Sequence, residues 1–212
     1  MTAVPKKDYT PEEYLELERA APHKSEYYDG EIFPMGDFGG DTPEAMAGAR
    51  ARHNAIKENA AFALNVHVRK TGGCQVFTSD QRICIPSNGL YTYPDVVVVC
   101  GKPQFTDDEF DTFSNPTLIV EVLSKRTASY DRGEKFGFYR NIPSLGEYLT
   151  IDSRKVVVEL WQKNGQGLWV LVYETRDTES EIRLESLDLT LSIADLYAYL
   201  DNFPAVDSGF GR

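Results

Sequence analysis

Two short runs of the chain are apolar on both faces, and each contains one acidic residue. Asp95 lies in Tyr-Pro-Asp-Val-Val-Val-Val (93–99), and Glu121 lies in Thr-Leu-Ile-Val-Glu-Val-Leu (117–123). Continuous, β-branched runs of this kind are typical of strands buried in the middle of a layered domain. An ionised carboxylate at that depth is costly unless a partner compensates its charge. The pattern therefore marks both acids as candidates for chemistry.

The spacing of the two acids predicts that they lie side by side. If the runs pair as an antiparallel hairpin across 101–115, residues that oppose each other have numbers with a constant sum. The midpoint between Asp95 and Glu121 is 108, which is also the midpoint of 101–115. Two carboxylates do not neutralise each other, so the simplest partner that compensates both charges is a divalent cation. The alternative is that Asp95 caps the strand beside Pro94 and that Glu121 forms a buried ion pair with an Arg or Lys.

From residue 10 to residue 85 the pattern predicts a short helix, a tight hairpin, a long helix and two strands. A capping box with Pro at the first helical position, Thr10-Pro11-Glu12-Glu13, opens the first helix, and Asp29-Gly30 is the hairpin turn. The long helix stops at Gly72-Gly73, and His53 lies on its apolar stripe. The expected bounds are 11–19, 25–28 with 31–35, 44–71, 75–77 and 82–85.

The second half of the chain predicts a sheet with one helix between its strands. This helix opens at 127–131, with Asp131 and Glu134 in the spacing of a capping box, and runs to about 141. Because a strand follows at 147–151, the strand, helix, strand order favours a parallel crossover. Further strands are expected at 96–100, 118–123, 156–161, 168–173 and 182–184, with a last short helix behind Ser192. The predicted fold class is α/β, with a central mixed β-sheet flanked by helices on both sides and additional β-hairpins.

Length and composition describe an ordinary globular protein. A chain of 212 residues suits a single domain over 1–212, with an ordered core of about 9–203 and a flexible tail from Pro204. No apolar stretch has membrane-spanning length and the N-terminus lacks a signal peptide, so we expect a cytoplasmic protein without a membrane partner. Cys74, Cys84 and Cys100 are an odd number without CxxC spacing, which predicts reduced core cysteines and neither a disulfide framework nor a zinc site.

The net charge of −11 restricts the partners that the chain can bind. It opposes nucleic-acid binding, for which a basic surface is the usual signature. Local clusters still concentrate positive charge at Arg50 with Arg52, at Arg69 with Lys70, and over 125–135. Each cluster is either a binding surface or a solvated face, and the solvated face is the more common case.

Asp95 and Glu121 suit metal-dependent phosphodiester cleavage, which needs carboxylates for Mg²⁺ and a cation for the developing charge. In the pattern PD…(D/E)XK a lysine stands two residues after the glutamate, but this chain has Leu123 there. Lys135, in the helix that follows, can supply the missing ammonium group. The alternative role for Lys135 is an i,i+4 pair with Asp131 on an exposed helix face.

A series of motifs follows the same order as in one known family. The motifs are 26–31 (Glu-Tyr-Tyr-Asp-Gly-Glu), His53, Ser79-Asp80, 93–96 (Tyr-Pro-Asp-Val), 121–124 (Glu-Val-Leu-Ser), 130–136 (Tyr-Asp-Arg-Gly-Glu-Lys-Phe) and 143–148 (Pro-Ser-Leu-Gly-Glu-Tyr). Over roughly 9–200 the chain resembles the Uma-type family of "putative restriction endonucleases", long labelled a domain of unknown function, within the PD-(D/E)XK nuclease superfamily.

The resemblance implies a restriction-endonuclease-like core and a Mg²⁺-dependent endonuclease acting on DNA, in which Mn²⁺ can replace Mg²⁺. It implies that Asp95 and Glu121 are metal ligands, that Lys135 is a relocated catalytic lysine, and that Glu26 is a further catalytic acid. The alternative for Glu26 is a glutamate on an edge strand facing water.

The resemblance also implies that His53, Asp80 and Ser124 line the site. For His53 the alternative is a satisfied histidine in the helix packing. The chain departs from the family pattern at Lys125, where Pro is usual, and at Ala128, where Glu is usual. These departures leave the metal ligands intact and concern the loop after Ser124.

A second class of function competes with the nuclease. A non-catalytic or regulatory interaction module would keep the fold, form a homodimer and present Trp161, Trp169 and Tyr173 as its partner surface. The acidic net charge favours this class. The presence of Asp95, Glu121 and Lys135 favours the nuclease.

Overall fold

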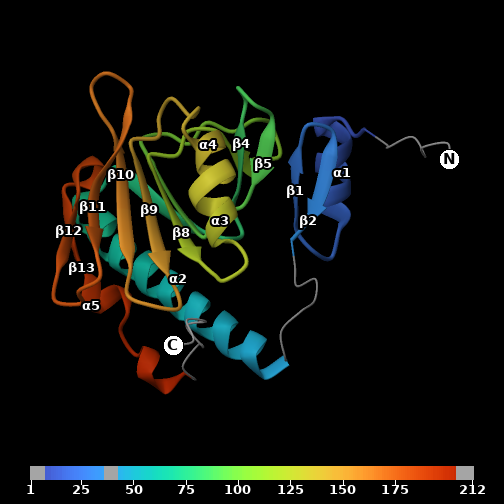
Figure 1. The fold of residues 1–212 in the computed structure, drawn as a ribbon. Coiled ribbons are helices and arrows are strands. Elements are labelled where there is room, and N and C mark those ends of the chain that lie inside the picture. Colours follow the sequence, from blue (N-terminus) through green and yellow to red (C-terminus); the bar gives the residue numbers. More distant parts are fainter. Residues whose placement is uncertain (1–7, 36–42, 204–212) are drawn as a thin grey trace.

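The computed structural model describes residues 8–35 and 43–203, and its architecture is the mixed α/β fold expected from the sequence (Figure 1). The helices are α1 (Pro11–Ala20), α2 (Pro43–Thr71), α3 (Ala128–Tyr130), α4 (Phe136–Tyr139) and α5 (Ile193–Leu196), with a π-helical turn (Asp131–Lys135) between α3 and α4 and 3₁₀ turns at Glu185–Leu187 and Leu200–Asn202. The strands are β1 (Ser25–Tyr28), β2 (Glu31–Pro34), β3 (Cys74–Thr78), β4 (Arg82–Ile85), β5 (Leu90–Thr92), β6 (Val96–Cys100), β7 (Thr112–Phe113), β8 (Leu118–Leu123), β9 (Glu147–Asp152), β10 (Val158–Lys163), β11 (Trp169–Thr175), β12 (Glu181–Leu184) and β13 (Leu189–Ser192). The prediction for the tail from Pro204 concerns residues outside the described ranges.

The central sheet has the strand order β11-β10-β9-β8-β6-β3. β8 and β9 are parallel, as expected for a crossover through the helix between them, and the other neighbours are antiparallel. β6 and β8 pair Val96 with Val120 and Val98 with Leu118, which is the register predicted from the midpoint of the two acids. This register sets Asp95, one residue before β6, opposite Glu121.

Different elements cover the two faces of the central sheet (Figure 1). Ile56 and Leu64 of α2 pack with Val120 of β8 and with α5 on one face. Ile119, next to Val120 in the same strand, packs on the other face with α4 and with the second sheet, whose order is β2-β1-β5-β4-β7. Because side chains alternate along a strand, Glu121 lies on the face of Ile119, beneath the helical segment.

The second sheet ties the N-terminal hairpin to the rest of the fold. Both hydrogen bonds of the Thr10–Glu13 capping box are present at the start of α1, as predicted. Asp29 (φ 47°) and Gly30 (φ 81°) make the tight turn between β1 and β2, because both adopt the left-handed conformation of such turns. β1 then pairs with β5 at Tyr27 and Tyr91, which brings its neighbour Glu26 beside Thr92.

The helix between β8 and β9 begins within the expected range of 127–131, but its first residues are not capped as the sequence indicated. We expected Asp131 to be its N-cap, but the helical run starts at Ala128, and Asp131 is buried inside it. The reason lies in the turn before it, where the Ser124 hydroxyl accepts hydrogen bonds from the backbone N–H groups of Arg126 and Thr127. The π-helical turn then joins α3 to α4, and π-helical turns are often found at functional sites.

The cysteine prediction is wrong for two of the three residues. Cys74 and Cys100 form a disulfide, while Cys84 is free and buried as expected. The physical reason is the β3–β6 register, which places Cys74 directly opposite Cys100. That register is invisible in a count of cysteines. Among the described helices, none is both long enough and apolar enough to cross a membrane.

Candidate active site

Asp95 and Glu121 meet where β6 begins and β8 ends. The Asp95 N–H donates to Glu121 Oε2 at 3.3 Å, and the Val122 N–H donates to Asp95 Oδ2 at 2.8 Å. Glu121 thus accepts a hydrogen bond from the backbone of Asp95, and Asp95 accepts one from the residue that follows Glu121. The Glu121 side chain is only 4% exposed, whereas that of Asp95 is 16% exposed, so Asp95 forms the more open side of the pair.

Lys135 reaches this pair from the π-helical turn. Its Nζ lies 3.0 Å from Glu121 Oε1, 3.5 Å from Glu26 Oε1 and 3.8 Å from Asp131 Oδ1. The i,i+4 pair with Asp131 thus exists, but it is buried and shares the ammonium group with two other acids. Lys135 occupies the place expected of a relocated lysine; its catalytic role stays a prediction.

Glu26 faces the site from β1, so a water-facing edge glutamate is the wrong description. Its side chain is 13% exposed and contacts Lys135. Thr92 donates a hydrogen bond to Glu26 Oε1, and the Tyr130 hydroxyl lies 3.5 Å from Glu26 Oε2. The β1–β2 hairpin therefore adds a third acid to the site, next to Lys135.

His53 completes one edge of the site from α2. Its Nε2 lies 3.2 Å from Asp95 Oδ2, so His53 contacts a site residue and is more than a packing residue of the helix. Burial alone lowers the pKa of His53, but the hydrogen bond to Asp95 and the nearby charges outweigh burial and raise the pKa. Conversely, burial raises the pKa of Asp95, but His53 and the Val122 N–H outweigh it and lower the pKa.

Two residues of the site were missed by the sequence interpretation. The Tyr139 hydroxyl donates to Glu121 Oε1 at 2.8 Å, and buried Asp131 lies beside Lys135. Asp131, Lys135 and Tyr139 are four residues apart, which places them on one helix face. That spacing could have identified Asp131 and Tyr139 as site residues. The interpretation of Asp131 as an N-cap placed it at the end of the helix, where it would not share this face.

The site holds more negative charge than the chain neutralises. Burial raises the pKa of Glu121 to about 8 although the Lys135 charge opposes this, and the charges of Asp131 and Asp95 raise it further. Burial also raises the pKa of Asp131, again against the charge of Lys135. For Lys135, burial lowers the pKa, but the surrounding acids raise it well above its ordinary value, so the ammonium group stays charged. The two buried acids thus share one cation.

The donor set at the site fits Mg²⁺. Asp95 and Glu121 offer carboxylate oxygens, and Mg²⁺ is commonly held by one or two carboxylates together with water and substrate phosphate. Mn²⁺ accepts the same oxygen ligands. Within 8–35 and 43–203, no group of three or more His, Cys, Asp or Glu side chains is arranged to hold a metal ion by itself.

Asp80 and Ser124 have other contacts. The Asp80 side chain is 89% exposed and pairs with Lys24, whose hydrogen bond lowers the Asp80 pKa. Ser124 caps the turn that begins α3, through the backbone of Arg126 and Thr127. The described contacts of these two side chains therefore do not join them to Asp95 or Glu121.

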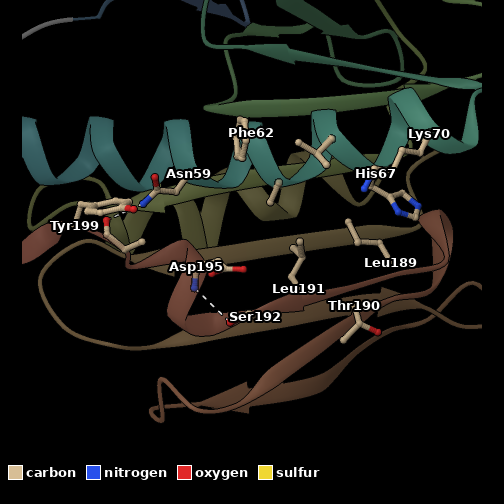
Figure 2. A pocket seen from close by; sticks show the side chains of 13 residues that line it. Asn59, Phe62, His67, Lys70, Leu189, Thr190, Leu191, Ser192, Asp195 and Tyr199 are labelled. Atoms are coloured by element: carbon tan, nitrogen blue, oxygen red, sulfur yellow. Dashed lines mark hydrogen bonds between the residues drawn. The ribbon is translucent and has the colours of Figure 1, made fainter.

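A separate pocket of about 450 Å³ lies between α2 and the β13–α5 segment (Figure 2). Its apolar wall includes Phe62, Leu189 and Leu191. His67 Nε2 lies 2.7 Å from the Leu187 carbonyl oxygen, and Ser192 caps α5. None of the site residues predicted from the sequence lines this pocket. The candidate active site is therefore the cluster around Glu121, and the pocket is separate from it.

Comparison with known proteins finds a family model and relatives that match most of the chain. Residues 11–194 match the model of the family "Uma2: Putative restriction endonuclease". The chain is 40% identical over 171 residues to "Uncharacterized protein sll1609" of Synechocystis sp. (strain ATCC 27184 / PCC 6803 / Kazusa), a match that covers 81% of this chain and 90% of the relative. It is 34% identical over 189 residues to "Uncharacterized protein slr1290" of the same organism, covering 89% of this chain and 90% of that relative.

A solved structure has the same fold. The crystal structure of "a putative nuclease belonging to DUF820" from Anabaena variabilis ATCC 29413 superposes with a TM-score of 0.66, covering 89% of this chain and 97% of that chain. The sequence identity is 19%, so this likeness speaks for the fold alone.

Proposed function

The chain belongs to the Uma2 family, described as "putative restriction endonuclease", and from this premise we propose that it is a Mg²⁺-dependent nuclease that hydrolyses phosphodiester bonds in DNA. The observation that carries the proposal is the convergence of Asp95 and Lys135 on Glu121, from a loop before β6 and from the π-helical turn. Two adjacent carboxylates with a buried, charged lysine are the groups that such hydrolysis requires.

Asp95 and Glu121 would hold the metal ion. Mg²⁺ bound there supplies a Lewis acid for the phosphoryl oxygen and lowers the pKa of its water. Tyr139 fixes Glu121 Oε1 through its hydroxyl, and His53 fixes Asp95 Oδ2 through Nε2. Both contacts hold the carboxylates in one orientation, which limits reorganisation during the reaction.

Lys135 would stabilise the charge that develops on the phosphoryl oxygens. A buried ammonium group aimed at that position is worth more than one in water, because little solvent screens it. Glu26 and Asp131 keep Lys135 charged and in place. A lysine supplied by the helix thus takes over the task that the motif lysine performs from the strand.

The decisive experiment compares two glutamates that differ in position and not in chemistry. Glu121→Gln removes a carboxylate from the site, whereas Glu134→Gln removes one from an exposed position in the helical turn that carries Lys135. Cleavage of a fluorescent DNA duplex is followed in Mg²⁺, in Mn²⁺ and in EDTA, and Mn²⁺ binding is measured by calorimetry.

We expect cleavage by the unmodified protein in either metal and none in EDTA. Glu121→Gln should lower the cleavage rate by about 10³-fold or more and weaken Mn²⁺ binding, since it removes a ligand. Glu134→Gln should change both by less than about twofold. A protein that binds Mn²⁺ but neither binds nor cleaves DNA is instead an interaction module.

One observation favours such a module. The predicted aromatic surface is not freely exposed, because Trp161 and Trp169 pack on Phe136 with ring centroids 5.3 Å apart. On β11, the edge strand of the central sheet, the apolar side chains Val170, Leu171 and Val172 are instead exposed, and such edges are common partner surfaces. Under this alternative, light scattering should show a dimer, and a charge substitution such as Leu171→Lys should dissociate it.

A further inference from the structure

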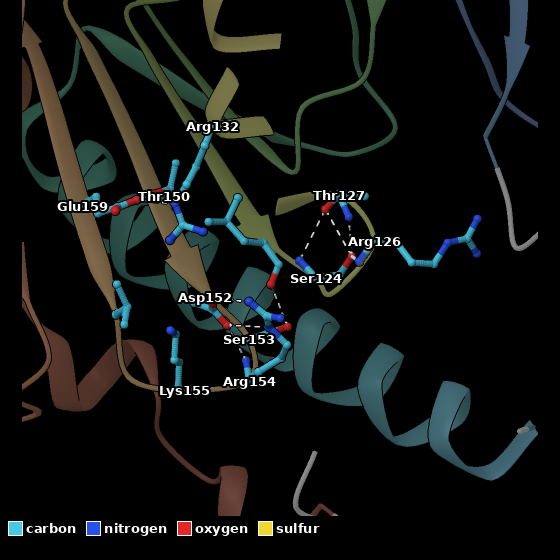
Figure 3. A network of polar contacts seen from close by, with 12 residues as sticks. Ser124, Arg126, Thr127, Arg132, Thr150, Asp152, Ser153, Arg154, Lys155 and Glu159 are labelled. Carbon is cyan, nitrogen blue, oxygen red and sulfur yellow. Dashed lines mark hydrogen bonds and ion pairs between the residues drawn. The ribbon is translucent and has the colours of Figure 1, made fainter. Parts of the chain in front are cut away.

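Basic side chains, among them Arg132, Arg154 and Lys155, gather toward the ends of β8 and β9 (Figure 3). Glu121 of the candidate active site lies two residues before the end of β8. We propose that Arg132 and Arg154 bind phosphates of the nucleic-acid backbone next to the phosphate that is cut. This proposal rests on the nuclease function proposed above. It assigns substrate positioning to two residues that lie outside the carboxylate and lysine cluster.

Arg132 is held on the same face of the sheet as Glu121. In the β8–β9–β10 registers, Glu121 pairs with Thr150, and Thr150 pairs with Glu159. Paired residues point to the same face and neighbouring strands are about 4.8 Å apart, so Glu159 lies about 10 Å from Glu121. Arg132 Nε donates to Glu159 Oε2 at 2.7 Å, and the Thr150 hydroxyl donates to the same oxygen at 2.9 Å. These hydrogen bonds thus hold the Arg132 guanidinium at Glu159, two strands from Glu121 on the same face of the sheet.

Arg154 is held at the end of β9. It donates to buried Asp152 through Nε at 3.1 Å and Nη2 at 2.8 Å. The Ser153 hydroxyl and N–H both donate to the Leu123 carbonyl oxygen, at 2.8 and 3.0 Å, so this turn is tied to β8. Leu123 is two residues after Glu121, a distance of about 7 Å along a strand.

Both ion pairs present the cation to solvent and keep the acid inside. Asp152 is 0% exposed while the Arg154 side chain is 27% exposed, and Glu159 is 17% exposed against 34% for Arg132. Arg132 uses only Nε for Glu159, which leaves the terminal nitrogens of its fork for another oxygen. An anion that approaches from solvent therefore contacts the guanidinium groups of Arg132 and Arg154 before the carboxylates behind them.

The spacing and the net charge both favour a polyphosphate backbone as the ligand. Each DNA strand carries one phosphate per about 3.4 Å of helix axis, and successive phosphates are farther apart in space because the strand winds around that axis. Groups about 7 to 10 Å from the site are therefore within reach of the phosphates next to the one that is cut. A chain of net charge −11 repels a polyanion elsewhere and needs local cations for contact. Exposed Lys155 follows Arg154 and adds charge to the same end of β9.

The test is a kinetic comparison of charge-removing variants. Arg132→Gln with Arg154→Gln is compared with Arg176→Gln with Arg183→Gln, two arginines paired with Glu174 and Asp188 away from the site. Cleavage of a 20-base-pair fluorescent duplex in Mg²⁺ gives kcat and KM from about 50 to 200 mM salt. We expect the site variant to raise KM about 10- to 30-fold at low salt, with kcat within about threefold.

Salt dependence and a charge-balanced variant sharpen the result. Losing two phosphate contacts should reduce the slope of log KM against log salt by about 1.8, and the control variant should keep the slope. Arg132→Gln with Glu159→Gln removes both members of one pair, so it keeps the net charge and leaves no unpaired acid. It should still raise KM several-fold.

The outcomes separate this proposal from the one that it rests on. If the unmodified protein neither binds nor cleaves the duplex, both proposals fall. If it cleaves the duplex and the site variants keep its KM and salt slope, Arg132 and Arg154 are structural ion pairs and the nuclease stands. A loss of kcat at constant KM also overturns the binding role, because it would place the arginines in the chemical step.

Discussion

Arg82 and Lys135 are both almost fully buried, but their surroundings balance charge in different ways. Arg82 donates to the Thr112 and Tyr93 hydroxyls at 2.8 and 3.0 Å and pairs with Asp111 at 2.8 Å. Asp111 also binds Arg19, at 2.8 Å. In this cluster two guanidinium groups pair with Asp111. At Lys135, a single ammonium group contacts three carboxylates.

The difference shows in the acids of the two clusters. The hydrogen bond from Arg19 holds the pKa of Asp111 well below its ordinary value, although burial opposes it. Burial raises the pKa of Glu121 to about 8. The chain's own groups therefore balance the charge of the Arg82 cluster, which we interpret as structural. The Lys135 cluster retains a surplus of negative charge that a proton or a metal ion must compensate, and that surplus is the property of a functional site.

The largest effect should come from removing the cation of the functional cluster. Lys135→Met should lower the cleavage rate by about 10³-fold or more, equivalent to about 4 kcal/mol of transition-state stabilisation. Metal affinity measured by calorimetry should stay near normal, since the role proposed for Lys135 is on the phosphate and not on the metal ion. Lys102→Met, at an exposed position, is the matched control. Unchanged cleavage with tight metal binding would dismiss the relocated lysine.

Removing the cation of the structural cluster should cost stability. Arg82→Met should lower the free energy of unfolding by about 3 kcal/mol, because it leaves hydrogen-bonding groups and an acid without their buried partner. Arg183→Met, at an exposed ion pair, should change it by less than about 0.5 kcal/mol. Urea denaturation measures both. A cost below about 1 kcal/mol for Arg82→Met would show that the network around it is dispensable.

The functional cluster should make the metal-free protein less stable as the pH rises. The pKa of Glu121 is raised from its ordinary value of 4.5 to about 8, so its contribution is fully present below pH 4.5 and is lost up to about pH 8. The slope from this group is at most about 1.4 kcal/mol per pH unit. In EDTA, Glu121→Gln should flatten the profile between these values, and Glu134→Gln should leave it unchanged. A profile that Glu121→Gln does not alter would contradict the surplus of charge.

The structural cluster should show the opposite pH dependence, with a smaller amplitude. Because the pKa of Asp111 is lowered, its contribution is present above its ordinary value of 3.8 and is lost as the pH falls further. The Asp111 side chain is 36% exposed, so solvent screening limits the effect to about 1 kcal/mol or less. Asp111→Asn should remove this acid-side loss in thermal melts recorded from pH 5 to pH 2. An unchanged acid limb would assign the loss to other carboxylates.

The sequence was most informative where a local rule fixes geometry. The midpoint of Asp95 and Glu121 predicted the β6–β8 register, because an antiparallel pair obeys a constant sum. The Thr10–Glu13 capping box and the Asp29-Gly30 turn were also predicted at the correct residues, since each depends on neighbours within four positions.

The remaining features depend on contacts between distant segments. The Cys74–Cys100 disulfide follows from the β3–β6 register, and no turn between these strands constrains it. The burial of Arg82 depends on Asp111 and Thr112, which lie about thirty residues further along the chain. The spacing of Tyr139 from Lys135 places both on one helix face, but the contact of Tyr139 with Glu121 depends on how that helix packs against β8.

The π-helical turn has a consequence for how this site can vary among relatives. A lysine on a strand is fixed by sheet register, because a shift of one residue turns its side chain to the opposite face. A helix can accommodate one additional residue as a π-helical turn without disturbing the neighbouring sheet. The reach of Lys135 can therefore change by insertion or deletion in 131–135 while Asp95 and Glu121 stay in place. The carboxylate pair and the ammonium group of this site can therefore vary as two separate parts.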